Sequence, residues 1–341
     1  MKIQTATPKL KNIYFIITRR CNLACSHCIR TSGPNIHDAL TLQEFKLALH
    51  NLEPYLQKNT RLLLSGGEPT LHPDFLPMLE HAKAIFTKIT INTNGLRKKQ
   101  LINAIEILPS LTIQVSLDGD ESSRDKIRGA GSFKRALSNI STLSKLNANV
   151  IVATTASKKN ITALDSLDSE LSPIPFVQWN IKREIIYGRS QHKTALSTGE
   201  WNDFVFSFNE KSLNKHRLEL QSHFAFNKNS LENIDKNTYA RENQNCGTGT
   251  SKLYINPNLT TYPCGCMEEI NLGNLIKEPI ESFEANFRKI KPILSENSPC
   301  HFCPFVKACN GGCPGYSLRT YGQIGVGDPR CPSINDLLSA G

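Results

Sequence analysis

The stretch IYFIITRRCNLACSHC, residues 13–28, decides the fold. Its first part is a run of apolar and β-branched residues that predicts a β-strand over residues 13–18. Three cysteines follow directly, Cys21, Cys25 and Cys28, in the spacing Cys-x3-Cys-x2-Cys. A cubic [4Fe–4S] cluster takes four thiolates, so three cysteines in one loop predict a cluster with one iron left open for a substrate or cofactor.

A second motif, Gly66-Gly67-Glu68-Pro69, follows the next predicted strand at residues 62–64. Together with the cysteine loop, it makes the chain resemble the radical S-adenosylmethionine (SAM) superfamily. The resemblance implies that the open iron chelates the amino and carboxylate groups of SAM and that the Gly-Gly-Glu-Pro turn supports the amino group. It also implies that the three cysteines are catalytic, because the reduced cluster passes an electron to SAM and a 5′-deoxyadenosyl radical results.

Clustered cysteines also occur in zinc knuckles, and His27, just before the third cysteine, is a residue type that binds zinc. Zinc sites usually combine two Cys-x2-Cys pairs, or one such pair with His-x3-His, and neither arrangement is present in this loop. The Gly-Gly-Glu-Pro motif therefore favours the iron–sulfur interpretation. The resemblance places the neighbourhood of His27 against the adenine of SAM.

Short apolar runs alternate with helical patterns in the first half of the chain, which predicts successive βα units around a parallel sheet. The predicted strands are residues 13–18, 62–64, 88–92, 111–116, 149–154 and 176–181. The predicted helices are a first one that opens with the capping box Thr41-Leu42-Gln43-Glu44, and then residues 74–86, 101–108, 133–146 and 161–171. The fold class is therefore predicted as α/β, a partial (β/α)6 TIM barrel with a small C-terminal cysteine-rich α+β extension that binds iron–sulfur clusters.

Polar residues gather where the predicted strands end, the edge at which barrel enzymes keep their sites. The resemblance implies that Ser116 and Asp118 meet the ribose of SAM and that Arg128 binds its carboxylate. Asn92 and Asn94 are further cofactor-binding candidates. The alternatives are a surface charge beside a turn for Arg128, a turn residue for Asp118, and strand caps for the two asparagines.

The C-terminal part of the chain is organised by cysteines. They stand at Cys246-x17-Cys264, then Cys300-x2-Cys303-x5-Cys309-x3-Cys313, and then Cys331. This order resembles the SPASM extension of radical SAM enzymes, which holds two auxiliary [4Fe–4S] clusters near the barrel opening. The resemblance implies an outer cluster on Cys300, Cys303, Cys309 and Cys331, and an inner cluster on Cys246, Cys264 and Cys313.

The inner set lacks a fourth thiolate. Cys266 is the candidate, although its place two residues after Cys264 is a cramped span for two corners of one cube. An open iron that binds substrate is one alternative, and a pair of zinc ribbons is the alternative for the whole region. Within it, residues 252–258 and 261–264 predict a hairpin whose Asn258 takes φ > 0 where the family often has glycine.

Three segments are expected from these motifs. Residues 1–195 form the radical SAM core, residues 196–245 a polar linker or bridging region, and residues 246–341 the SPASM domain. Three [4Fe–4S] clusters and SAM are the implied cofactors.

Composition sets further bounds. The chain of 341 residues is 39% hydrophobic and 21% charged, and no apolar run approaches the ~18 residues of a membrane span. The start MKIQTATPKLKN has no signal-peptide h-region, so a cytoplasmic protein is expected, in which eleven cysteines indicate metal ligation rather than disulfides. The net charge of +10 suits an acidic partner such as a peptide leader, or a simply solvated surface, better than nucleic acid.

These features predict a peptide-modifying oxidoreductase of the radical SAM/SPASM type. Its substrate would be a ribosomally made precursor peptide that receives a crosslink, a thioether or an altered stereocentre. The expected partners are a reductant such as flavodoxin or ferredoxin and a leader-recognition element in the barrel, the linker or a separate protein; no membrane is expected.

Other functions stay open. An anaerobic sulfatase maturase shares both cysteine patterns and would need a base, for which Asp235 is the candidate. A small-molecule alcohol dehydrogenase would more often have a shorter extension with one auxiliary cluster. An RNA-modifying enzyme would show a shallow basic groove. An iron–sulfur electron carrier would need the cysteines but has no use for the SAM-binding motifs.

Overall fold

The computed structural model describes residues 8–38, 40–221, 247–289, 294–303, 306–309, 311–331 and 334. Its strands form one sheet in the order β7-β6-β5-β4-β3-β2-β1-β8-β9. Their bounds are β1 Leu10–Thr18, β2 Leu56–Gly66, β3 Lys88–Thr93, β4 Thr112–Ser116, β5 Asn149–Ala156, β6 Gln178–Arg183, β7 Leu218–Leu220, β8 Lys252–Ile255 and β9 Thr261–Tyr262.

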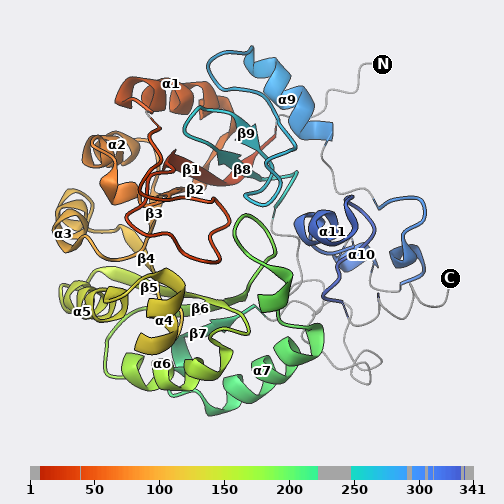
Figure 1. Cartoon of the computed structure of the whole chain (residues 1–341). Helices are drawn as coiled ribbons and strands as arrows, with labels where there is room; N and C mark the ends of the chain where they lie inside the picture. The colour runs from red at the N-terminus through yellow and green to blue at the C-terminus, as the bar shows by residue number, and fades with distance from the viewer. Residues whose placement is uncertain are drawn as a thin grey trace.

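Neighbouring strands from β7 to β8 are parallel, and β9 is antiparallel to β8. Helices cover the outside of the curved sheet (Figure 1). They are α1 Leu42–Leu52, α2 Phe75–Ala82, α3 Lys98–Ile107, α4 Glu121–Arg128, α5 Ser132–Lys145, α6 Leu164–Leu171, α7 Thr198–Lys211, α9 Ile280–Lys289, α10 Val306–Cys309 and α11 Pro314–Tyr321. This arrangement confirms the α/β fold class and the open partial barrel.

One row of the register shows how the barrel is held together. Phe15 lies opposite Leu64, and the row continues through Ile91, Ile113 and Val150 on the next three strands. All five side chains are buried in a single apolar core. Because parallel strands in this register end together, the loops that follow β1, β2, β3 and β4 meet at one edge of the sheet.

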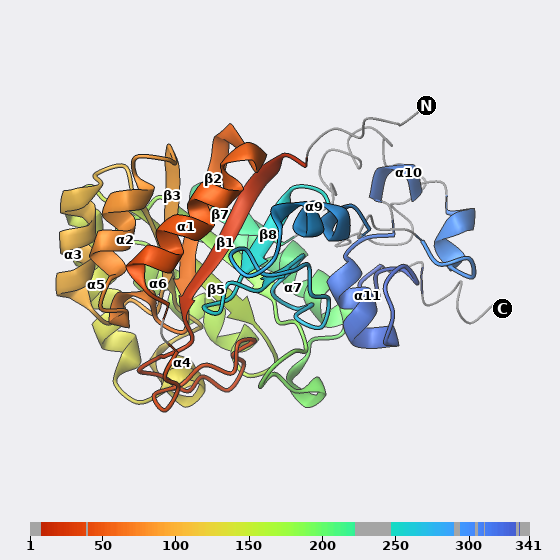
Figure 2. The same cartoon turned by 90° about the horizontal axis from the view of Figure 1, so that it is seen from above.

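The sheet extends beyond the six predicted strands at both sides. β7 adds to β6, and β8 pairs in parallel with β1, so that segments far apart in the chain share one sheet. Figure 2 shows the C-terminal elements α9 and β8 beside β1, with α10 and α11 farther along the same side. The cysteine-rich region is thereby joined to the barrel through backbone pairing.

Local signals in the sequence explain several elements. The predicted capping box is present: the Thr41 side chain accepts from the backbone N–H of Glu44, and the Glu44 carboxylate accepts from that of Thr41. The helix that it starts buries Phe45, Leu49 and Leu52 as its apolar spacing predicts.

Two features differ from the expectations. Helix α4 was not predicted, because its sequence ESSRDKIR has almost no apolar periodicity. Asp120 caps this helix by accepting a hydrogen bond from the backbone N–H of Ser123 at 2.9 Å.

The β8–β9 hairpin is present, but its residue with positive φ is Leu259 (φ 63°) and not Asn258, so the prediction for Asn258 is wrong. The Asn258 side chain instead accepts a hydrogen bond from the backbone N–H of Thr260 at 3.1 Å. This bond stabilises the turn from the residue that precedes Leu259.

Within the described residues, no helix combines the length and the apolar character that a membrane span requires.

Candidate functional site

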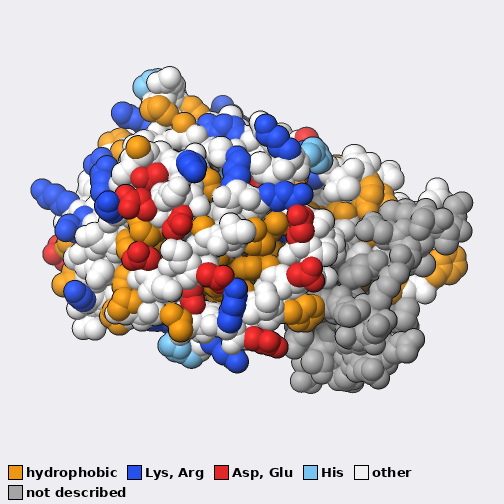
Figure 3. Space-filling view, turned by 60° about the horizontal axis from the view of Figure 1, so that its bottom comes forward, with side chains coloured by type: hydrophobic (Ala, Val, Ile, Leu, Met, Phe, Trp, Pro, Cys, Tyr) orange, Lys and Arg blue, Asp and Glu red, His pale blue; other side chains and the backbone are white. Residues whose placement is uncertain are grey.

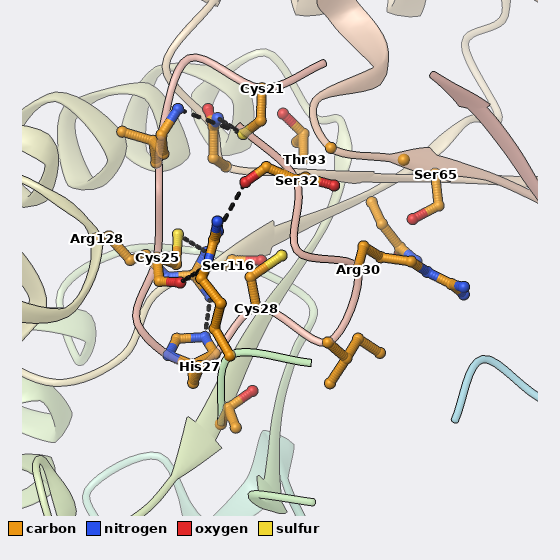
Figure 4. Close-up of a pocket in the computed structure, with 18 of the residues that line it drawn as sticks. Cys21, Cys25, His27, Cys28, Arg30, Ser32, Ser65, Thr93, Ser116 and Arg128 are labelled. Atoms are coloured by element: carbon orange, nitrogen blue, oxygen red, sulfur yellow. Dashed lines mark hydrogen bonds between the residues drawn. The ribbon is translucent and has the colours of Figure 1, made fainter. Parts of the chain in front are cut away.

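A cavity of about 370 Å³ opens where the strands end (Figure 4). Its wall comes from the cysteine loop after β1, from the segments that end β2, β3, β4 and β6, and from Tyr254 of β8. The predicted residues that line it are Cys21, Cys25, Cys28, Gly66, Gly67, Asn92, Asn94, Ser116 and Arg128. Glu68, Pro69 and Asp118 do not line it.

The cysteine loop is held in place by Arg189, a residue that the sequence did not single out. Its guanidinium donates to the carbonyls of Cys25 (2.8 Å) and Ser32 (2.7 Å), and its backbone N–H donates to the carbonyl of Cys28 at 3.0 Å. The preceding Gly188 has φ 64°, and a Cβ there would lie 2.5 Å from the Cys28 carbonyl oxygen. The segment after β6 therefore clamps the loop.

The three cysteines all line the cavity, and none of them forms a disulfide. Among the described residues, no three cysteine, histidine or acidic side chains converge on a point that one metal ion would occupy. N–H groups face two of the sulfurs: the Asn94 amide lies 3.9 Å from Cys21 Sγ, and Arg128 Nη1 lies 3.7 Å from Cys25 Sγ. Spaced thiols with N–H donors fit a multi-iron cluster, whose sulfurs accept such hydrogen bonds.

Burial controls the ionisation of these thiols when no metal is bound. It raises the pKa of Cys21 to about 12, and it also raises the pKa of Cys25. Metal ligation requires thiolates, so cluster assembly at this loop must release protons.

The cavity also carries polar atoms that have no partner in the described part of the protein. Asn92 Oδ1 and Ser32 Oγ are both buried at its wall and unpaired. Unpaired buried polar atoms cost free energy unless a ligand or water satisfies them, so this wall fits a polar cofactor such as SAM.

The Glu68 carboxylate is completely buried, and Glu68 is not among the residues that line the cavity. It accepts from Thr93 Oγ1 (2.8 Å), from the Asn94 N–H (2.7 Å) and from both the hydroxyl and the N–H of Thr70 (2.6 and 3.2 Å). Burial raises its pKa, while these hydrogen bonds act in the opposite direction. Glu68 thus ties the turn after β2 to the end of β3.

Gly67 sits where the turn crosses the cysteine loop, and its replacement by alanine is a test of that packing. A Cβ at Gly67 would lie 2.4 Å from the Arg20 carbonyl oxygen and 2.6 Å from that of Arg19. We expect Gly67→Ala to lower the free energy of unfolding by about 1–3 kcal/mol, measured by urea denaturation. Gly33→Ala is the matched control, since a Cβ there would have nothing within 4 Å; equal effects of the two changes would contradict the packing argument.

Asp118 and Arg128 form a buried ion pair behind the cavity. Arg128 Nε donates to Asp118 Oδ2 at 2.5 Å, and the Thr155 N–H donates to Asp118 Oδ1 at 2.8 Å. Burial alone would raise the pKa of Asp118, but the Arg128 charge and these hydrogen bonds lower it below its ordinary value. His27 Nε2 lies 3.5 Å from the same carboxylate, and burial lowers the pKa of His27 to about 4. The pair leaves the Arg128 Nη atoms on the cavity side, close to Cys25 and His27 (Figure 4).

Arg124 is a site residue that the sequence analysis missed. It is fully buried and donates to the carbonyl of Ser116 and, at 3.2 Å, to that of Asn94, so it joins the ends of β4 and β3. Burial lowers its pKa to about 9. The sequence offered no signal for it, because α4 itself has almost no apolar periodicity.

The described C-terminal cysteines fall into two groups. Cys264 and Cys266 are hydrogen-bonded to each other, which lowers the pKa of Cys264, and a Cβ on Gly315 would lie 3.7 Å from Cys313 Sγ and 3.8 Å from Cys266 Cβ. The second group is Cys300, Cys303, Cys309 and Cys331. Burial raises the pKa of Cys300 and of Cys309, and the nearby Cys303 adds to both shifts. Burial also raises the pKa of Tyr321, and the nearby Cys300 and Cys331 add to that shift. Cys246 and Asp235 lie outside the described residues.

Arg30 connects the two parts of the molecule. This arginine of the cysteine loop pairs with Glu268 at 2.6 Å and lies over the Tyr254 ring at 5.0 Å. A Cβ on Gly265 would lie only 2.6 Å from its Nη2 atom, which places the Cys264-Gly265-Cys266 turn against Arg30. The cysteine-rich region therefore abuts the cavity.

A parallel partial barrel with a three-cysteine loop at the carboxyl edge of its strands defines a class of barrel proteins built to hold a metal cluster beside a cofactor pocket. Residues 15–162 match the Radical SAM superfamily, and this part of the chain is a radical SAM domain. Members of this superfamily use SAM and a [4Fe–4S] cluster.

Curated relatives align over nearly the whole chain. An AdoMet-dependent heme synthase of Methanosarcina barkeri is 24% identical over 97% of this chain and 98% of its own length. The mycofactocin maturase MftC of Mycobacterium tuberculosis is 26% identical over 92% of this chain and 81% of its own.

Solved structures share the fold. Streptococcus suis SuiB bound to the precursor peptide SuiA aligns with a TM-score of 0.75 at 16% identity, over 95% of this chain and 75% of that one. Native anSMEcpe with bound AdoMet aligns with a TM-score of 0.72 at 16% identity, over 96% of each chain.

Proposed function

We propose that this radical SAM protein removes a hydrogen atom from a ribosomally made peptide and oxidises or crosslinks it. The observation that carries the proposal is the meeting of Cys21, Cys25, Cys28, Ser116 and Arg128 around one cavity. When bound at the three cysteines, a reduced cluster would supply the electron that converts SAM into methionine and a 5′-deoxyadenosyl radical.

The residues around the cavity would hold SAM in the position that this reaction needs. Arg128 is oriented by Asp118 and presents its Nη atoms for a carboxylate. Asn92 and Ser32 offer unpaired polar atoms, and Ser116 stands at the wall where a ribose would fit. Glu68 would act by positioning the Gly66-Gly67 turn rather than by direct contact.

The C-terminal cysteines would hold two auxiliary clusters of the SPASM type. In this proposal Cys300, Cys303, Cys309 and Cys331 ligate the outer cluster, and Cys246, Cys264, Cys313 and Cys266 ligate the inner one. The assignment of Cys266 to the inner cluster is supported by its place in the same group as Cys264 and Cys313.

We divide the chain into the three segments expected from the sequence, residues 1–195, 196–245 and 246–341. Strand β7 joins the second segment to the core sheet, and strand β8 joins the third.

Relatives support the peptide substrate. MftC is described as a maturase, and SuiB was solved with a precursor peptide. The test is to incubate the reconstituted protein with SAM, a reductant and peptides encoded beside its gene, one of them deuterated at carbon. We expect a change in peptide mass and deuterium in 5′-deoxyadenosine; cleavage of SAM without either would contradict the peptide proposal.

A porphyrin carrying carboxylates is the second candidate substrate, because a relative described as an AdoMet-dependent heme synthase aligns over 97% of this chain. Five cations line the cavity in support: Lys182, Arg183, Arg189, Arg30 and Arg128. Of these, Arg30 and Arg128 are paired with Glu268 and Asp118. The same incubation with an iron porphyrin carrying propionates, followed by absorption and mass spectrometry, separates the two candidates. Conversion of the porphyrin but of no peptide would favour this alternative.

A further inference from the structure

A cluster of four exposed cations lies outside the barrel, next to the loop between β3 and α3. We call it the basic patch: Arg97, Lys98, Lys99 and Arg135. Two hollows of about 300 and 320 Å³ run between these side chains and share Leu96, Lys98 and Arg135. Figure 3 shows lysine and arginine side chains toward the left of that face, the flank on which Figure 1 draws α3 and α5.

The charges of the basic patch are not balanced by neighbours. In the part of the chain that the structure describes, no carboxylate pairs with any of the four, whereas the adjacent Lys134 pairs with Glu121 at 2.8 Å. The Arg135 guanidinium donates to the Leu96 carbonyl at 3.4 Å, which holds the two helix starts together.

The patch also occupies the ends of α3 and α5 where positive charge is least favourable. The helix dipole makes an N-terminus favour acidic side chains, by roughly 0.3–1 kcal/mol each. Helices α1, α4 and α7 follow this rule with Glu44, Glu121 and Glu200 in their first turns. Helices α3 and α5, like α2 and α11, have no acidic residue there, but α3 and α5 carry cations instead. The helix dipole therefore gives no stabilising reason for these cations to stand at these helix starts.

The basic patch stands a short distance from the cysteine loop. From Leu96, two peptide bonds lead to Asn94, whose side-chain amide lies 3.9 Å from Cys21 Sγ. The same amide donates to Asn22 Oδ1 at 2.8 Å, so this contact is fixed on both sides. The loop that carries the basic patch is therefore continuous with the residue that faces the first cluster ligand.

We infer that the basic patch docks an acidic one-electron donor protein of the flavodoxin class. The inference rests on the proposed function, which requires a cluster at Cys21, Cys25 and Cys28 to be reduced. One electron leaves the flavin of the donor, which is oxidised by one electron, and the cluster gains it; no bond or proton is transferred. Opposite charges on the two surfaces steer the encounter and make it depend on ionic strength.

The test compares two triple variants with equal changes in charge. The patch variant reverses the charge of three residues of the basic patch: Arg97→Glu/Lys98→Glu/Lys99→Glu. The control variant reverses the charge of three exposed cations near the other ends of β2 and β3: Lys58→Glu/Arg61→Glu/Lys88→Glu. SAM cleavage is measured once with a purified bacterial flavodoxin and once with dithionite. With flavodoxin at low salt, we expect the rate of SAM cleavage by the patch variant to fall about 10-fold or more. With dithionite, its rate should equal that of the wild type. The control variant should cleave SAM at the wild-type rate with either reductant.

Binding provides a second readout that does not need the loaded enzyme. Titration of the flavodoxin with wild-type protein and both variants, followed by calorimetry, should show weakened binding for the patch variant alone. Equal effects of the two variants on binding, or no effect of either, would overturn the inference. If wild-type protein cleaves no SAM even with dithionite, the proposed function fails, while the binding comparison still decides whether the patch docks the donor.

Discussion

An Asp118→Asn variant is expected to lose about 3–5 kcal/mol of unfolding free energy at neutral pH, the cost of breaking a buried ion pair from one side. The reason is the burial of both partners: Asp118 is 0% exposed and the Arg128 side chain 11%. Asparagine keeps the size of the side chain but leaves the guanidinium without its opposite charge. SAM cleavage should also fall, because Arg128 loses the carboxylate that orients it.

The loss should depend on pH with a definite sign. The pKa of Asp118 lies below its ordinary 3.8 in the folded protein, so the unfolded chain takes up its proton first as the pH falls. The stabilisation is therefore complete above about pH 5, begins to fall near the unfolded-state pKa, and disappears as the pH drops through the folded-state pKa. The stability difference between wild type and Asp118→Asn should be constant from about pH 5 to 7 and shrink below about pH 4.

Urea denaturation at several pH values checks both statements. The control is Asp165→Asn, which removes an exposed ion pair with Lys211, 2.8 Å long and more than half exposed on both sides; we expect it to cost about 0–1 kcal/mol. If the two variants lose similar amounts, the Asp118–Arg128 pair does not hold the site together.

Replacing Glu68 with leucine should be comparably severe. The carboxylate accepts four hydrogen bonds from the backbone and hydroxyl groups of Thr70, Thr93 and Asn94, all of them buried. Each buried donor left without an acceptor costs about 1–3 kcal/mol, so a total loss above about 3 kcal/mol is expected.

Glu68→Gln separates this positioning role from direct contact with SAM. Glutamine keeps one acceptor oxygen, so it should restore part of the stability lost in Glu68→Leu. If Glu68 only positions the turn, SAM affinity should recover in proportion to stability. A Glu68→Gln protein that is stable but binds no SAM would contradict the positioning role and indicate direct contact.

Much of the fold was accessible from local patterns, because each predicted strand is a short apolar run and the first helix carries its own capping box. Those signals act between neighbours in the chain. The sequence also predicted where each strand ends. Because parallel strands in register bring their ends to one edge of the sheet, it predicted that Cys21, Asn94 and Ser116 lie at the same edge.

The features that were missed depend on contacts between distant segments. Arg124 is buried by strands from outside its own helix, and α4 has no apolar face to mark it. Arg30 meets Glu268 across 238 residues, a pairing that no local spacing encodes. The inward turn of Glu68 likewise depends on Thr93 of the next strand.

The central claim is that the cavity beside Cys21, Cys25 and Cys28 performs radical SAM chemistry. The most direct measurement is 5′-deoxyadenosine formation by anaerobically reconstituted protein with SAM and dithionite, compared with the Cys21→Ala/Cys25→Ala/Cys28→Ala variant. We predict about 12 irons per chain and SAM cleavage for the wild type, and about 8 irons without cleavage for the variant. A cluster-replete wild type that cleaves no SAM, even with candidate substrates present, or a variant that cleaves as fast as the wild type, would contradict the claim.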